Sequence, residues 1–227
     1  MSDFSLWFKT GVLHITDWQG YDHMLFLLIT MGVFIWRDKK TVLTNITGFT
    51  VGHSITLILS TLEFIHYSSE LIEILIPTTI AISAILQLFT LNKTPSKNDQ
   101  TIQFSIILIF GLIHGMGFST LLKSMLGKEE SIVQPLLAFN LGIEFGQILI
   151  VSILLTISTL CLKIWHIQSR DFKLFIAAFV LSLSLKMIIE RIPAEGNDSE
   201  KSCEIPQKLP TFVNTQYLNI NEFSLHA

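Results

Sequence analysis

Residues 134–162 read QPLLAFNLGIEFGQILIVSILLTISTLCL, and Glu144 is the only charged residue in this stretch. Apolar stretches of about 17 to 25 residues are long enough to cross the hydrocarbon core of a bilayer as an α-helix. The stretch therefore predicts a membrane-spanning helix. Five further stretches predict the same: residues 21–36, 42–62, 71–91, 102–122 and 173–190.

The composition of the whole chain agrees with a membrane protein. Half of the 227 residues are hydrophobic and only 15% are charged, whereas soluble domains carry about 25% charged residues. We therefore predict an all-α, polytopic membrane helix bundle with about six transmembrane helices. Residues 4–13, FSLWFKTGVL, predict a short interfacial helix before them. This segment lacks the basic start and cleavage site of a signal peptide, so we expect it to be retained.

The six spans leave no room for a separate soluble domain, so residues 1–193 are expected to form a single transmembrane domain. After Pro193 the sequence becomes polar and loses its periodicity, which predicts a disordered tail over residues 194–227. Cys161 and Cys203 have neither the number nor the spacing of a disulfide framework or a zinc knuckle.

The distribution of positive charge predicts how the chain is oriented. The net charge is −3, and no basic patch points to a nucleic-acid partner. The loops after the first, third and fifth spans hold Arg37, Lys39, Lys40, Lys93, Lys97, Lys163, Arg170 and Lys173. The opposite loops and the N-terminus hold only Lys9, Lys123 and Lys128. The positive-inside rule then makes the first set of loops cytoplasmic and places both termini outside.

Several polar side chains interrupt the predicted spans. A charged side chain at the centre of a bilayer costs about 2.5 to 3.5 kcal/mol on insertion scales, so such residues normally face a cavity or a partner. The polar residues are His53, Ser54, Thr56, His114, Asn140, Glu144 and Gln147, with Asp22 and His23 at the start of the first span. Counting residues from the predicted span ends places the ionisable groups at similar depths in the outer half of the membrane.

The spacing of these residues indicates which helix faces point inward. Asn140, Glu144 and Gln147 share one face of a helix. The pairs Gly48/Gly52 and Gly111/Gly115 are small-residue motifs that let a neighbouring helix approach closely. The inner halves of the spans carry few ionisable groups, and the polar Asn45 and Thr47 are the best candidates there for an inward route.

Each signal also has a purely structural explanation. His53 alone can bond a carbonyl of a neighbouring helix, and Glu144 can be a protonated acid tied to Asn140. Together, however, imidazoles and carboxylates at one depth favour a site for Ni²⁺, Co²⁺ or Zn²⁺. Adjacent helical residues point about 100° apart. Asp22 is therefore either a ligand beside His23, helped by a break at Gly20, or a partner that orients a histidine.

Four motifs occur in a characteristic order: GVLHITDWQGYDHMLFLL, FTVGHSITLILS, FGLIHGMGFS and FNLGIEFGQ. As a set they resemble the HupE/UreJ family of bacterial membrane proteins, regarded as nickel or cobalt permeases that supply hydrogenase and urease. The resemblance covers about residues 8–192. It implies an inner-membrane protein of six or seven helices that moves Ni²⁺.

The resemblance also implies which residues bind the ion. The histidine and the Asp-His pair of the first motif carry over to His14, Asp22 and His23, and the later motifs add His53, His114 and Glu144 as partners. Seven residues separate His14 from the Asp-His pair, where the permeases have five. The fourth-span motif contains one histidine where theirs contains more.

Three functions follow as hypotheses. The first is a permease in which ions pass the outer lip HITDWQGYDH, with Trp18 and Tyr21 anchoring it at the interface, and reach the buried ligands. The second is an intramembrane zinc-dependent hydrolase or transferase for a lipid-linked substrate, with Asp22 or Glu144 as the base and Ser54 orienting the substrate. The third is a structural or assembly subunit. A metallocentre-assembly partner is not identified by the sequence.

Overall fold

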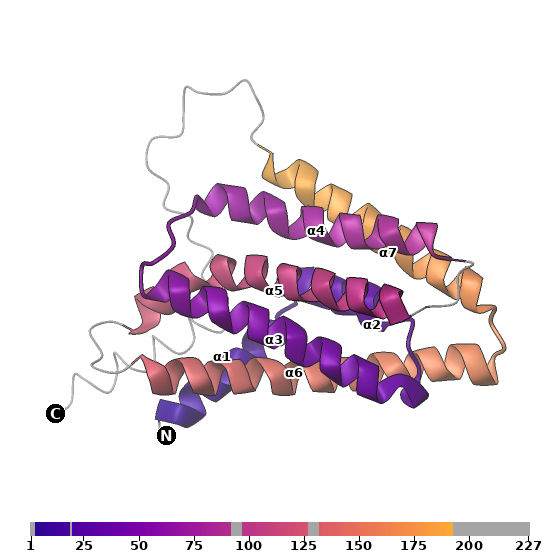
Figure 1. Ribbon diagram of the computed structural model, residues 1–227, viewed down its shortest axis with the longest axis horizontal. Helices are drawn as coiled ribbons and strands as arrows, with labels where there is room; N and C mark the ends of the chain where they lie inside the picture. Colours follow the sequence, from indigo (N-terminus) through magenta and orange to yellow (C-terminus); the bar gives the residue numbers. More distant parts are fainter. Residues whose placement is uncertain (1–2, 19, 92–96, 127–131, 193–227) are drawn as a thin grey trace. The chain divides into compact units, whose positions relative to one another are not determined.

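The computed structural model describes residues 3–18, 20–91, 97–126 and 132–192, so the predicted tail lies outside the described residues. Seven α-helices occur in them (Figure 1): α1 (Asp3–Thr16), α2 (Asp22–Met31), α3 (Lys39–Thr61), α4 (Ser69–Phe89), α5 (Lys97–Leu126), α6 (Val133–Thr159) and α7 (Ser169–Arg191). A short 3₁₀ turn precedes α3 and a π-helical turn follows α6. There is no strand in the described part of the chain. The predicted all-α membrane bundle is confirmed.

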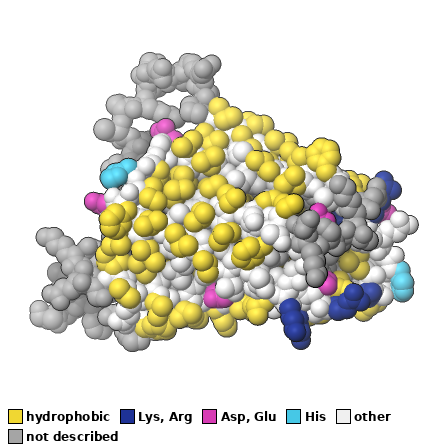
Figure 2. Space-filling model, viewed as in Figure 1, with side chains coloured by type: hydrophobic (Ala, Val, Ile, Leu, Met, Phe, Trp, Pro, Cys, Tyr) yellow, Lys and Arg dark blue, Asp and Glu magenta, His cyan; other side chains and the backbone are white. Residues whose placement is uncertain are grey.

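Five of the helices are long and apolar enough to cross a membrane: α3 with its preceding turn, α4, α5, α6 with its following turn, and α7. They coincide with the second to sixth predicted spans. Hydrophobic side chains cover the middle of the visible face, whereas Lys and Arg gather at one end (Figure 2). This pattern is typical of a protein whose flanks contact lipid and whose ends contact water.

The first predicted span differs from the structure. The chain leaves helical geometry after Thr16 and re-enters it at Asp22, so α2 has only 10 residues. A helix of that length is about 15 Å long, about half the thickness of the hydrocarbon core. The apolar sequence is interrupted there by polar Asp17 and by Gly20, a residue of low helix propensity.

The helix α1 packs closely against α6. A Cβ atom added at Gly11 would lie 2.1 Å from the carbonyl oxygen of Phe139, and one at Gly142 would lie 2.2 Å from that of Phe8. The backbones of α1 and α6 therefore touch, and the two helices lie side by side (Figure 1). The predicted short N-terminal helix is present as α1, and glycines on both helices allow it to pack closely against α6.

The two short helices together follow α6 along most of its length. Ile15 near the end of α1 packs against Gly146, and the hydroxyl of Ser158 donates a hydrogen bond to the carbonyl of Gly32, directly after α2. The pair α1–α2 thus lies along α6 as two short helices in series.

The helices α3 and α5 make a second glycine contact. A Cβ atom at Gly52 would lie 2.5 Å from the carbonyl oxygen of Leu108, and one at Gly111 would lie 2.4 Å from that of Phe49. Further along both helices, Gly115 lies against the carbonyl of His53. The two helices therefore run in the same direction in contact, which brings the turns that carry His53 and His114 side by side.

Gly111→Ala is expected to destabilise the protein. The added methyl group would overlap the Phe49 backbone, and overpacking of this kind costs about 1 to 3 kcal/mol. Thermal unfolding in detergent should show a lower midpoint. Gly117→Ala is the matched control on α5, since its methyl group would meet only two side chains, Ile76 at 3.2 Å and Ile72 at 3.5 Å. Equal midpoints for the two variants would contradict this role of the glycine contact.

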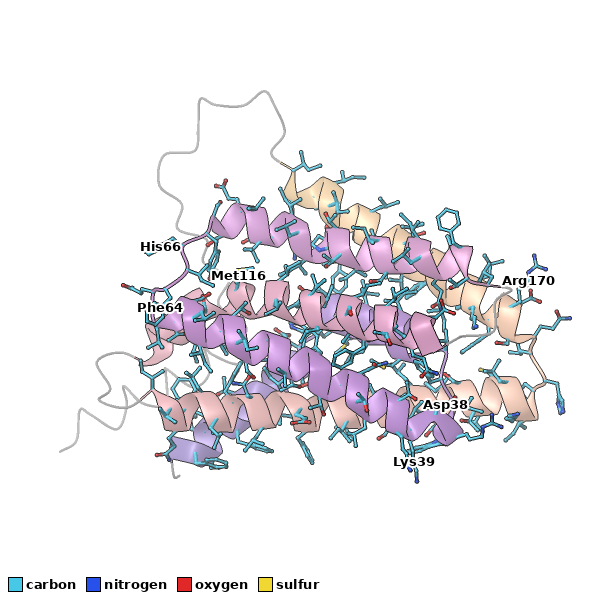
Figure 3. All side chains as sticks on the ribbon, viewed as in Figure 1. Asp38, Lys39, Phe64, His66, Met116 and Arg170 are labelled. Carbon is cyan, nitrogen blue, oxygen red and sulfur yellow. The ribbon has the colours of Figure 1, made fainter. Side chains whose placement is uncertain are left out.

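The two ends of the bundle differ in charge. Asp38, Lys39 and Arg170 lie at one end, and Phe64 and His66 lie at the opposite end (Figure 3). We refer to the first as the Lys/Arg-rich end. His53 is 14 residues from Lys39 and 8 residues from Thr61, or about 21 Å and 12 Å along the helix. The turn that carries His53 is therefore closer to the end opposite the Lys/Arg-rich one.

Candidate metal centre

Four histidines from four different helices meet inside the bundle. His14 lies in the last turn of α1, His23 in the first turn of α2, and His53 and His114 within α3 and α5. The ring centroid of His23 is 4.8 Å from that of His14 and 4.5 Å from that of His114, and His14 is 6.3 Å from His53. We call these four residues the imidazole cluster. The break between α1 and α2 is what brings two of its members to one place.

The carboxylate of Asp22 adjoins the cluster. One of its oxygens accepts a hydrogen bond of 2.8 Å from the backbone N–H of His23 and lies 3.0 Å from the Nδ1 atom of the same ring. The second contact lacks hydrogen-bond geometry. Both side chains are buried. The adjacent residues Asp22 and His23 thus face the same space, because they stand at the very start of a helix.

Seven of the eight ring nitrogens in the cluster are buried without a hydrogen bond. Nε2 of His14 and both ring nitrogens of His23, His53 and His114 are buried without a hydrogen bond. His53 is 0% and His114 2% exposed. A buried polar atom without a partner costs about 1 to 3 kcal/mol. Such a concentration of unpaired ring nitrogens in one place is typical of groups that bind a ligand.

The spacing of these atoms fits a single ion. One ligand atom each from Asp22, His23 and His114 lies within 4.8 Å of the other two. Two ligands bound tetrahedrally at about 2.1 Å lie about 3.4 Å apart, so small side-chain movements bring all three into a coordination shell. His14 and His53 stand next to this group and offer further nitrogens.

Aromatic rings enclose the cluster on two sides. Towards the Lys/Arg-rich end, Phe26 and Phe110 stack with centroids 3.6 Å apart, and Phe49 lies 5.3 Å and 6.1 Å from them. We call these three residues the inner aromatic layer. On the other side Phe118 and Phe139 stack at 4.6 Å, and His14 lies 4.1 Å from Phe118. All five phenylalanines are buried, so the cluster is closed on both sides.

The remaining polar residues named from the sequence lie beside the cluster. The hydroxyl of Thr47 donates to a carboxylate oxygen of Glu144, and that of Thr50 donates to the side-chain oxygen of Gln147. Glu144 is half-buried and pairs with α3 rather than with the imidazoles. Thr47 precedes His53 by six residues, about 9 Å along α3.

Asn140 and Ser54 bond the backbone of their own helices. The side-chain amide of Asn140 donates to the carbonyl of Leu136, and its side-chain oxygen is buried without a hydrogen bond. The hydroxyl of Ser54 donates to the carbonyl of Thr50. The second-span hydroxyl that the hydrolase hypothesis uses is therefore engaged within its own helix.

The sequence did not predict the enclosure of the cluster. Phe118 and Phe139 stand inside the conspicuous motifs, but a phenylalanine in an apolar span carries no signal of its own. Tyr67, in the loop before α4, was also missed, and its hydroxyl bonds the Ser119 hydroxyl and the carbonyl of Met116 beyond His114. Gly20 has no positive φ, and a Cβ atom there would meet only Asp22 at 3.8 Å, so the break does not require a glycine.

The fold and the cluster define the class: a multi-pass helical membrane protein with a buried His/Asp group that can hold a metal ion. The family model described as HupE / UreJ protein matches residues 1–191. The chain belongs to the HupE/UreJ family. Searches of curated proteins and of solved structures each returned no match.

Proposed function

We propose that the protein transports a divalent transition-metal ion, nickel or cobalt, across the bacterial inner membrane. The binding site in this proposal consists of His14, Asp22, His23, His53 and His114. The observation that carries it is that the end of α1 and the start of α2 meet at four imidazoles, and seven of their eight ring nitrogens are buried without a hydrogen bond. The family membership and the resemblance of the motifs to nickel and cobalt permeases support the choice of ion.

The ligand chemistry favours an exchangeable transition metal. Imidazole and carboxylate suit Ni²⁺, Co²⁺ and Zn²⁺, and transport requires binding that is weak enough for release. Within the described residues the grouped ligands include no thiolate, because Cys161 lies in the turn after α6, outside the group. A carboxylate beside the imidazoles also offsets part of the charge of the ion.

The broken helix supports transport rather than a static site. Secondary transporters bind ions where a discontinuous helix leaves half-helix ends inside the membrane. The C-terminal end of α1, which carries His14, is the negative end of that helix dipole and favours a cation. Asp22 supplies negative charge at the first turn of α2, whose dipole end is positive. A connection of this kind can shift without unfolding either half.

The charge distribution supports one orientation. Under the positive-inside rule the Lys/Arg-rich end is cytoplasmic, and the start of α1 and the end of α7 then lie on the outer side. The cluster lies nearer that outer side. Ions would enter past the Phe118–Phe139 pair and leave towards the Lys/Arg-rich end.

Uptake of Ni²⁺ or Co²⁺ into liposomes that contain the purified protein tests the proposal. Asp22→Asn keeps the shape of the side chain but removes the charge, so it is expected to reduce uptake at least ~10-fold, as loss of a group that supports metal ligands does. Asp171→Asn is the matched control, because Asp171 also stands in the first turn of a helix but is exposed. It should transport like the wild type.

The same preparation separates transport from catalysis. Stoichiometric zinc that survives chelation, with no ion uptake, would overturn the proposal in favour of the zinc-dependent hydrolase. Equal uptake by Asp22→Asn and wild type would remove Asp22 from the site.

A further inference from the structure

A cavity of about 620 Å³ opens among α2, α3, α4, α5 and α7 at the Lys/Arg-rich end. Asp38 and Lys173 are among its lining residues, and Thr30, Gln103 and Ile107 line it deeper in the bundle. A single water molecule needs only about 10 to 15 Å³ of such a cavity. The cavity is therefore large enough for a hydrated ion.

Three helices connect this cavity to the imidazole cluster, and each carries its residues in the same spatial order. On α3, Thr41 lines the cavity, and Asn45, Phe49 and His53 follow at successive turns of one face. Asn45 is 3% exposed, and its amide nitrogen has no hydrogen-bond partner. An unsatisfied buried amide at this position is unexplained by packing alone.

The other two helices repeat this order. On α5, Gln103 and Ile107 line the cavity, Phe110 is the next turn, and His114 follows. On α2 the chain runs the other way, so His23 comes first, Phe26 next, and Thr30 last at the cavity. The cavity residues nearest the cluster are three to four residues from Phe26 and Phe110, about 5 Å along their helices.

We propose, on the basis of the transport function above, that this cavity is the ion's vestibule at the Lys/Arg-rich end and that the inner aromatic layer is the barrier between it and the cluster. Phe26, Phe49 and Phe110 contact one another and also the imidazoles. The ring centroids are 4.1 Å apart for Phe110 and His114 and 5.9 Å apart for Phe49 and His53. Their apolar faces stop a hydrated cation. Displacement of the stacked Phe26–Phe110 pair joins the cavity to the ligands, and Asn45 offers its side-chain oxygen to the ion on the way.

This route does not pass along the contact between α3 and α6, where Thr47 meets Glu144. Thr47, which the sequence also offered as an inward group, has its hydroxyl bonded to Glu144 and is exposed on the outer surface of the bundle. Asn45 instead lies on the cavity side of α3. Of Asn45 and Thr47, the two residues that the sequence offered for an inward route, the position of the cavity therefore favours Asn45.

The release rate of bound metal tests the barrier. Full-length protein loaded with Ni²⁺ or Co²⁺ is diluted into a chelator, and the remaining bound metal is followed with time. Phe110→Ala is expected to release the ion at least ten times faster than wild type, and Phe110→Leu, which retains most of the apolar volume and so should fold, about three times faster. Phe175→Ala, an exposed ring on α7, should leave the rate unchanged.

A block in the cavity distinguishes an opened route from a merely weakened site. Gln103→Cys is introduced together with Cys161→Ala and Cys203→Ser, and the new thiol is modified with a bulky cationic thiosulfonate. Modification should return the release rate of the Phe110→Ala protein to within about twofold of wild type. It should not slow release from Phe118→Ala, because Phe118 lies on the other side of the cluster.

The outcomes separate the two proposals. If wild type binds metal but the Phe110 variants release it no faster, the vestibule and barrier are wrong and the metal site stands. The same holds if the Gln103→Cys, Phe110→Ala protein releases metal equally fast with and without thiol modification. If wild type binds neither Ni²⁺ nor Co²⁺, the proposed function falls and the barrier with it.

Discussion

His23→Ala is expected to abolish metal binding and ion uptake. His23 is the central ring of the cluster, in contact with His14 and His114 and beside Asp22. Loss of a residue that only supports a metal ligand costs 10- to 100-fold in affinity, so loss of a ligand at the centre should cost at least ~100-fold, about 2.8 kcal/mol. Metal bound per protein by elemental mass spectrometry, and uptake into liposomes, measure the effect.

The control for this variant is His66→Ala. His66 is exposed and lies at the end of the bundle opposite the Lys/Arg-rich end (Figure 3). Its loss should change neither metal content nor uptake. If His23→Ala retained the metal content of wild type while remaining folded, the cluster would not be a metal site.

Gly11→Leu should detach α1 and remove His14 from the cluster. Even a methyl group at this position would lie 2.1 Å from the Phe139 carbonyl, so a leucine must drive the two backbones apart. The contact of α1 with α6 is its principal one, and a displacement of several ångströms cannot be absorbed elsewhere. We expect loss of metal affinity of at least ~10-fold together with a lower unfolding midpoint, because overpacking costs about 1 to 3 kcal/mol or more.

A double-mutant comparison shows whether the effect of Gly11 on metal affinity acts through His14. Combining Gly11→Leu with His14→Ala should lower the affinity no further than the stronger single change, since variants that remove the same contact are not additive. Gly20→Ala is the control, because its methyl group meets no atom closer than 3.8 Å. Fully additive losses would mean that α1 affects the cluster by another path.

Much of the fold could be predicted because membrane insertion imposes local rules. Every stretch long and apolar enough to span the bilayer forms a helix that satisfies its own backbone, so five long spans were located correctly. The first span was misplaced for the same reason. A rule based on length alone predicted a span over residues 21–36, whereas α2 ends at Met31.

The polar residues of the cluster could be named because they are costly in lipid. His53 and His114 stand out in any apolar helix, and His14, Asp22 and His23 stand out by their family motif. Glu144 stands out equally, yet it pairs with Thr47 on α3. The free-energy cost of placing its carboxyl group in lipid indicates that Glu144 has a partner, but it does not identify that partner.

The sequence by itself determined the class of fold, the membrane-crossing stretches, the glycine motifs and the set of polar residues from which a metal site can be built. Each of these follows from the free energy of placing a short segment of the chain in a bilayer. Only the tertiary structure decided that α1 and α2 lie in series beside α6, that four histidines converge there, and that phenylalanines lie between them and a cavity. These features depend on contacts between residues far apart in the chain, whose energies arise from close packing and leave no periodic mark on the segments that make them.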